Sequence, residues 1–123
     1  MTTAANTQEK QQDDLTVFMM VKTMPEWLGL PVEGRFAHLN RYMKPILTKY
    51  QDELRCRLFD TEFYSTRVTD VWMWEATSRH AYEMAMEELR ETPFWDRFFS
   101  IVEILAGIEN AYARNYEREP ISH

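Results

Sequence analysis

An acidic residue and two indoles share one face of a short β-rich segment in the middle of the chain. Asp70, Trp72 and Trp74 alternate with other residues, and alternate side chains of a β-strand point to the same side. A carboxyl group packed against aromatic rings is poorly solvated, which raises its pKa towards the range useful for proton transfer. The spacing therefore makes Asp70 a candidate general base or acid, with Trp72 and Trp74 as walls of a substrate pocket.

Two arginines are candidates for binding an anion near this carboxylate. Arg55 and Arg57 alternate within the preceding β-rich segment, and a guanidinium can hold a carboxylate or stabilise an enolate-like oxyanion. The same residues also have a structural interpretation, because charges enclosed between two subunits pair with one another and fix their register. Structural ion pairs perturb charged groups as readily as active sites do, so both interpretations stay open.

Further candidates for contacting a ligand are Lys22, Trp27, His38, Tyr64 and Glu103. Lys22 and Glu103 share the expected strand face of the carboxylate, and Tyr64 lies in the turn before that strand. Trp27 lies in a loop rich in Pro and Gly, where we expect it to pack down as a lid or plug. His38 lies on an expected helix, from which it could reach the mouth of a pocket.

No metal or cofactor is predicted. The chain has three histidines, and no two of them have the i,i+4 spacing of a metal site. Glycine-rich nucleotide-binding loops and the common hydrolase signatures are also missing from the sequence. Any chemistry is therefore expected to be cofactor-independent.

The pattern of apolar residues predicts a ferredoxin-like α+β fold. The expected strands are residues 15–22, 53–63, 68–75 and 100–105, and the expected helices are residues 31–50, with a kink at Pro45, and 77–90. A short third helix is expected after Thr92 and Pro93, and a bend or bulge at Gly107. The order βαββαβ predicts a four-stranded antiparallel sheet with two helices on one face.

The other face of this sheet would be open unless a partner covers it. Strand alternation assigns to it an apolar set with embedded charges: Phe18, Met20, Lys22, Arg55, Arg57, Phe59, Asp70, Trp72, Trp74, Glu103 and Leu105. Each assignment depends on register, because a slip of one residue inverts a whole strand. Two such faces packed together would form a homodimer, the dimeric α+β barrel, with a small-molecule pocket between them.

Composition narrows the class of protein. The 123 residues predict one domain at residues 14–117, between a disordered tail at 1–13 and a C-terminal tail at 118–123. The net charge of −6 argues against nucleic acid and anionic membranes as partners. No apolar stretch approaches the roughly 20 residues that span a bilayer. The single cysteine, Cys56, suggests a buried thiol in a reducing compartment, so the cytoplasm is expected.

From residue 15 to residue 117 the chain resembles the darcynin family of small bacterial proteins. The resemblance rests on Thr16-Val17-Phe18-Met19, Lys22-Thr23, Pro25-Glu26-Trp27-Leu28, Asp60-Thr61-Glu62-Phe63-Tyr64-Ser65, Val68-Thr69-Asp70-Val71-Trp72-Met73-Trp74-Glu75, Thr92-Pro93-Phe94-Trp95-Asp96, Val102-Glu103-Ile104-Leu105 and Glu109-Asn110-Ala111-Tyr112-Ala113-Arg114-Asn115-Tyr116. It implies no established reaction, and no catalytic residue is carried over from it.

Three functions are consistent with these residues. The leading hypothesis is a small cofactor-independent enzyme that isomerises, cyclises or dehydrates an organic metabolite, as in natural-product tailoring, or that acts as a cofactor-free oxygenase. Asp70 would be its base, and Arg55 or Arg57 would stabilise the anion. The alternatives are a non-catalytic protein that binds a small molecule, and a purely structural dimer module.

Overall fold

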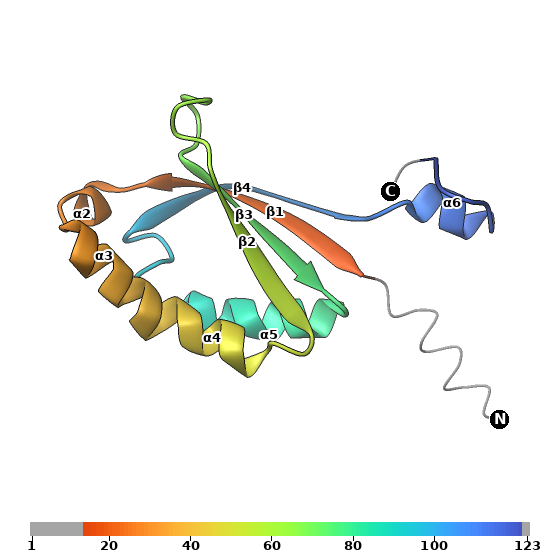
Figure 1. The fold of residues 1–123 in the computed structure, drawn as a ribbon, viewed down its shortest axis with the longest axis horizontal. Helices are drawn as coiled ribbons and strands as arrows, with labels where there is room; N and C mark the ends of the chain where they lie inside the picture. Colours follow the sequence, from red (N-terminus) through yellow and green to blue (C-terminus); the bar gives the residue numbers. More distant parts are fainter. Residues whose placement is uncertain (1–13, 122–123) are drawn as a thin grey trace.

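Four antiparallel strands and a layer of helices make up the fold, which a computed structural model describes for residues 14–121 (Figure 1). In chain order the elements are β1 (Leu15–Thr23), α2 (Pro25–Leu28), α3 (Val32–His38), η1 (Leu39–Met43), α4 (Lys44–Lys49), β2 (Leu54–Asp60), β3 (Asp70–Ala76), α5 (Arg79–Leu89), β4 (Phe99–Ile108) and α6 (Ala111–Asn115). The strand order is β2-β3-β1-β4. The predicted ferredoxin-like fold is therefore confirmed.

The predicted domain limits stay a prediction. Residues 1–13, the expected N-terminal tail, lie outside the described part of the chain, as do residues 122 and 123. The C-terminal segment that follows β4 is described, and its short helix α6 lies well away from the other helices, beyond the end of the sheet (Figure 1).

The core lies between the sheet and the helical segments η1, α4 and α5. Val17, Met19 and Val21 of β1 are at most 1% exposed, because alternate residues of this central strand all face the helices. The helix α5 contributes small residues, Ala81 and Ala85, which allow its backbone to approach the sheet closely. It begins where the Ser78 side chain accepts a hydrogen bond from the backbone N–H of Ala81, as expected of an N-cap.

The expected kink at Pro45 takes the form of a π-helical turn. Proline lacks a backbone N–H, and its ring clashes with the carbonyl of the preceding helical turn. The segment η1 directly precedes Pro45, and in it the N–H of Lys44 bonds to the carbonyl of Leu39. This wider turn lets the chain continue from α3 into α4 without breaking.

A cluster of aromatic rings closes the end of the core. The ring of Trp27 lies 5.1–5.4 Å from those of Phe94, Phe98 and Phe99, so the expected plug is confirmed. The prediction of a short helix after Pro93 is wrong, because residues 92–98 form turns that direct these rings inward. Asp96 has a left-handed backbone with φ 70°, and its N–H bonds to the Phe99 carbonyl at 2.8 Å.

The irregularity of β4 lies at Val102 rather than at Gly107. Met20 pairs with Glu103 and Val21 pairs with Ile101, which leaves Val102 as an extra residue in the ladder. Gly107 pairs regularly with Thr16. The bulge lets Ile101 face the helices while Glu103 stays on the opposite side of the sheet.

Two phenylalanines test the extent of the core. Phe94 is 1% exposed and Phe36 is 61% exposed. Phe94→Ala should lower the free energy of unfolding by about 3–5 kcal/mol, because it leaves a cavity in the packed aromatic cluster. Phe36→Ala, the matched control, should cost less than about 1 kcal/mol. Urea unfolding followed by circular dichroism measures both, and equal losses would contradict the placement of this cluster.

Candidate functional site

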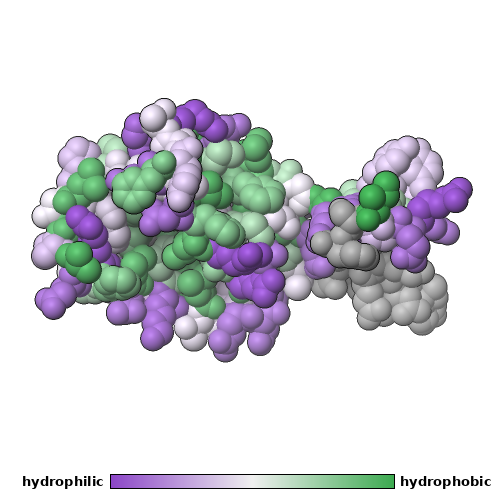
Figure 2. Space-filling model, turned by 45° about the horizontal axis from the view of Figure 1, so that its top comes forward, coloured by the Kyte–Doolittle hydropathy of each residue, from purple (hydrophilic) through white to green (hydrophobic). Residues whose placement is uncertain are grey.

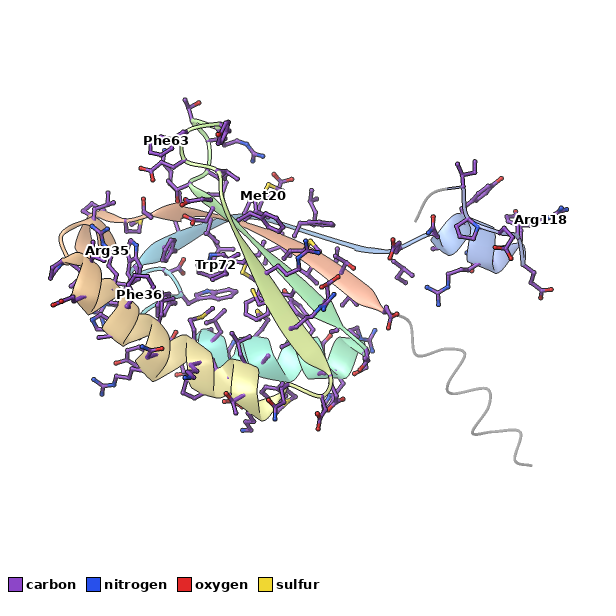
Figure 3. All side chains as sticks on the ribbon, in the orientation of Figure 1. Met20, Arg35, Phe36, Phe63, Trp72 and Arg118 are labelled. Carbon is purple, nitrogen blue, oxygen red and sulfur yellow. The ribbon has the colours of Figure 1, made fainter. Side chains whose placement is uncertain are left out.

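The structure reverses the predicted facing of β3. Trp72 pairs with Met19 and Trp74 pairs with Val17, and these two partners face the helices. Trp72 is 4% exposed and Trp74 is fully buried. Figure 3 shows Trp72 pointing towards the helices, whereas Met20 lies on the opposite side of the sheet. The two indoles are therefore core residues rather than walls of a pocket on the open side.

Asp70 lies at the end of β3, on the same side as these indoles. It stands opposite Asp60 of β2 and Val21 of β1, and the Thr69 hydroxyl donates to its carboxylate at 2.7 Å. Partial burial raises the pKa of Asp70, and the nearby carboxylates of Asp60 and Glu62 raise it further against the effect of the Thr69 hydrogen bond. The expected direction of the pKa shift is therefore found, but acidic residues rather than arginines surround the group.

The side of the sheet turned away from the helices is called the open face from here on. It comprises Thr16, Phe18, Met20, Lys22, Arg55, Arg57, Phe59, Val71, Met73, Glu75, Glu103, Leu105 and Gly107. Figure 2, which brings the upper side of Figure 1 forward, shows apolar side chains across the middle of the domain with polar ones around them. Phe18 is 40% exposed and Leu105 is 50% exposed, so this face is a broad apolar surface.

Most charges of the open face are already paired. Arg55 bonds to Glu75 at 2.6 Å across the β2–β3 ladder. Glu103 bonds at 2.8 Å to Arg67, which belongs to the loop between β2 and β3. Arg57 differs, because its guanidinium lies over the Phe59 ring at 5.3 Å and no carboxylate of the described residues 14–121 pairs with it.

Arg57 borders a hollow in the open face. The hollow has a volume of about 400 Å³, and its lining comprises Thr16, Phe18, Arg57, Met73, Glu75, Gly107, Ile108 and Glu109. A Cβ atom added at Gly107 would meet no atom within 4 Å. The site thus combines an apolar floor, an ion pair at one side, a further carboxylate from Glu109, and Arg57, with which no carboxylate of the described residues pairs.

The remaining predicted residues do not meet in this hollow. Lys22 and Glu103 lie on the open face at its other end, where Lys22 donates to the Thr66 carbonyl at 3.4 Å. Tyr64 is 89% exposed in the loop between β2 and β3. Trp27 and His38 belong to the aromatic plug, and the His38 ring lies 4.8 Å from that of Phe98.

Sequence reasoning missed Met73 and Glu75 as residues of the open face. One signal could have found them: Arg55 and Glu75 are opposite charges in neighbouring strands, as expected of directly paired positions. Within the described residues, no group of three His, Cys, Asp or Glu side chains could hold a metal ion. No helix there is long and apolar enough to cross a membrane.

Fold and site together define a ferredoxin-like α+β domain in which no helix of residues 14–121 covers the open face of the sheet. A model of the family described as "Darcynin, domain of unknown function" matches residues 1–123. The chain belongs to the darcynin family, which confirms the resemblance. A darcynin homolog from Granulibacter bethesdensis is 62% identical over 108 residues, which cover 88% of this chain and 87% of the relative. Another, from Streptomyces avermitilis, is 49% identical over 114 residues, covering 93% and 94%.

Solved structures of chlorite dismutase from Candidatus Nitrospira defluvii share the fold. The complex with imidazole has a TM-score of 0.67 at 12% identity and covers 89% of this chain and 47% of that chain. A mutant form has a TM-score of 0.66 at 13% identity and covers 83% and 43%. The chain therefore spans less than half the length of these structures, and the likeness shows the fold alone.

The pKa of Asp70 predicts a pH effect on stability. An acid whose pKa is raised by folding loses its proton first in the unfolded chain, so folding stability falls as pH rises above about 4. Asp70→Asn removes this loss, and its amide oxygen still accepts from Thr69. We expect the variant to be more stable than wild type at pH 7 and equally stable at pH 3 in urea unfolding.

The matched control for Asp70 is the exposed carboxylate Asp52. Asp52→Asn should leave the difference in stability between pH 7 and pH 3 unchanged. A similar gain for both variants at pH 7 would show that overall negative charge, rather than burial of Asp70, is responsible.

The thiol of Cys56 should be unreactive. Cys56 stands opposite Trp74 on the helical side, and burial raises the pKa of its thiol from 9.0 to about 12. Because the thiolate is the reactive form, we expect modification by dithionitrobenzoate at pH 8 to be at least ~100-fold slower in the folded protein than in urea. Equal rates would contradict the burial of this side chain.

Proposed function

We propose that the protein binds a small organic anion in the hollow of the open face and acts as a homodimer. The observation that carries this proposal is Arg57, which no carboxylate of residues 14–121 pairs with and which lies beside the apolar side chains of Phe18 and Met73. A guanidinium recognises a carboxylate through paired hydrogen bonds, and apolar walls favour the hydrocarbon part of the same molecule. An aromatic or aliphatic carboxylic acid fits this combination.

The homodimer is proposed because the open face needs a cover. Phe18, Phe59 and Leu105 are each at least 40% exposed on it, and contiguous exposed apolar surface marks an interaction site. The ion pairs Arg55–Glu75 and Arg67–Glu103 lie within one chain, so a second copy could cover them without bringing two unpaired like charges together. Covering the hollow would also remove its ligand from water.

The predicted proton-transfer enzyme has less support from this geometry. Asp70 lies on the helical side of the sheet, whereas Arg55 and Arg57 lie on the open face. A substrate in the hollow would meet Glu75, whose carboxylate Arg55 already holds at 2.6 Å. Binding without turnover therefore explains the arrangement better than catalysis by Asp70.

Anilinonaphthalene sulfonate, an aromatic anion whose fluorescence reports binding, tests the site. Removing the cation should weaken binding by about tenfold, because a hydrogen bond to a charged group contributes about 1.5–3 kcal/mol. We expect Arg57→Gln to raise the dissociation constant by that factor, and benzoate to compete with the probe on wild type.

Arg41→Gln is the matched control, because Arg41 is also exposed and lies over an aromatic ring, that of Tyr42 at 5.1 Å. It should change the dissociation constant by less than about twofold. If both arginine variants weaken the probe equally, the protein has no anion site at Arg57.

A further inference from the structure

Two aromatic side chains stand almost fully exposed at the tip of the loop between β2 and β3. Phe63 is 90% exposed and Tyr64 is 89% exposed. In Figures 1 and 3 this loop rises from the end of the sheet on the side opposite the helices, with Phe63 near its top. Exposed aromatic rings are costly in water and are typical of contact surfaces.

The loop, residues 61–69, is held in place by its own hydrogen bonds. The N–H of Thr61 bonds to the Thr69 carbonyl, and the N–H of Tyr64 bonds to the Thr61 carbonyl, both at 2.8 Å. The Ser65 hydroxyl accepts from the N–H groups of Arg67 and Val68. The tip is thus a preformed projection, which loses little conformational entropy on binding.

The base of the loop is fastened to the open face. Arg67 bonds to Glu103 at 2.8 Å and also contacts the sulfur of Met20 at 3.4 Å. Lys22 donates to the Thr66 carbonyl. These contacts fix the tip beside the open face, at the end of the sheet opposite the hollow.

We propose that the Phe63–Tyr64 tip of each copy closes the hollow of the other copy in a homodimer. Each ligand site would then contain Arg57 and Phe18 from one copy and the two exposed rings from its partner. This inference rests on the proposed homodimer, and it adds that the site is incomplete within one chain.

Two-fold symmetry allows this arrangement. A two-fold axis between two stacked sheets can run along the strands or across them. An axis along the strands would bring the two raised loops to the same end, away from both hollows. An axis across the strands places each loop at the far end of the partner sheet. The six residues that separate Thr16 from Lys22 on β1 correspond to about 20 Å, the distance between the two ends.

Disulfide capture between two variant copies tests the contact. In a Cys56→Ala background, copies carrying Tyr64→Cys are mixed with copies carrying Thr16→Cys and oxidised mildly at low protein concentration. We expect the mixed disulfide to form at least tenfold faster than that between Val32→Cys and Thr16→Cys copies, because Val32 is 61% exposed on a helix away from the open face.

Three outcomes would overturn the proposal. Rapid disulfide formation among Tyr64→Cys copies alone would show that the loops meet each other. Equal rates for the Tyr64 and Val32 pairs would indicate random collision. A monomer in sedimentation at about 100 µM would exclude the homodimer, because proteins with a standard homodimer interface associate well below that concentration.

Binding of anilinonaphthalene sulfonate separates this inference from the proposed ligand site. Replacing both Phe63 and Tyr64 by Ala should weaken the dimer and the probe together, whereas Arg57→Gln should weaken the probe and leave the dimer intact. If disulfide capture succeeds but Arg57→Gln binds the probe normally, the contact made by the tip is supported and the anion site at Arg57 is excluded. Both tip residues are almost fully exposed, so their replacement should not impair folding.

Discussion

Helices cover only one face of the four-stranded sheet, and the rest of the structure depends on this constraint. The central strands β1 and β3 place Met19, Val21 and Trp74 fully out of water against the helices. The opposite side chains of the same strands have no second layer to cover them within residues 14–121. Because α6 lies beyond the end of the sheet (Figure 1), residues 14–121 leave this apolar surface uncovered.

The element order could be predicted from the sequence because its signals are local. Alternation of apolar residues marks β1, and Ser78 marks the start of α5 through its own side chain. Four strands and two helical regions in this order then leave few possible topologies. Residues 92–98 could not be predicted in the same way, because packing of Phe94 and Phe98 against Trp27 overrides the local preference for a helix.

The prediction of which side of β3 faces the helices failed for a different reason. Both of its alternating sets contain apolar and charged residues, so composition alone does not decide which side meets the helices. The decision is non-local: β1 sets the register, and that register places Trp72 and Trp74 beside the buried residues Met19 and Val17. The observed register places Asp70, the predicted catalytic group, on the opposite side of the sheet from the arginines. The assignments of Arg55, Arg57, Glu103 and Leu105 to the open face were correct, because the pairing of β2 and β4 preserves them.

Arg57 gives the open face a property that packing alone does not explain. A guanidinium enclosed in a dry, tightly packed interface costs several kcal/mol unless a carboxylate or other acceptors satisfy it. Arg55 meets that condition within the chain through Glu75 at 2.6 Å, and Glu103 meets it through Arg67 at 2.8 Å. Arg57 instead borders a hollow of about 400 Å³, which is large enough to keep water or an organic anion beside the guanidinium. A purely structural dimer module would have no need to place beside a hollow an arginine that no carboxylate of residues 14–121 pairs with. The hollow therefore favours a binding function for the covered face over simple dimer packing.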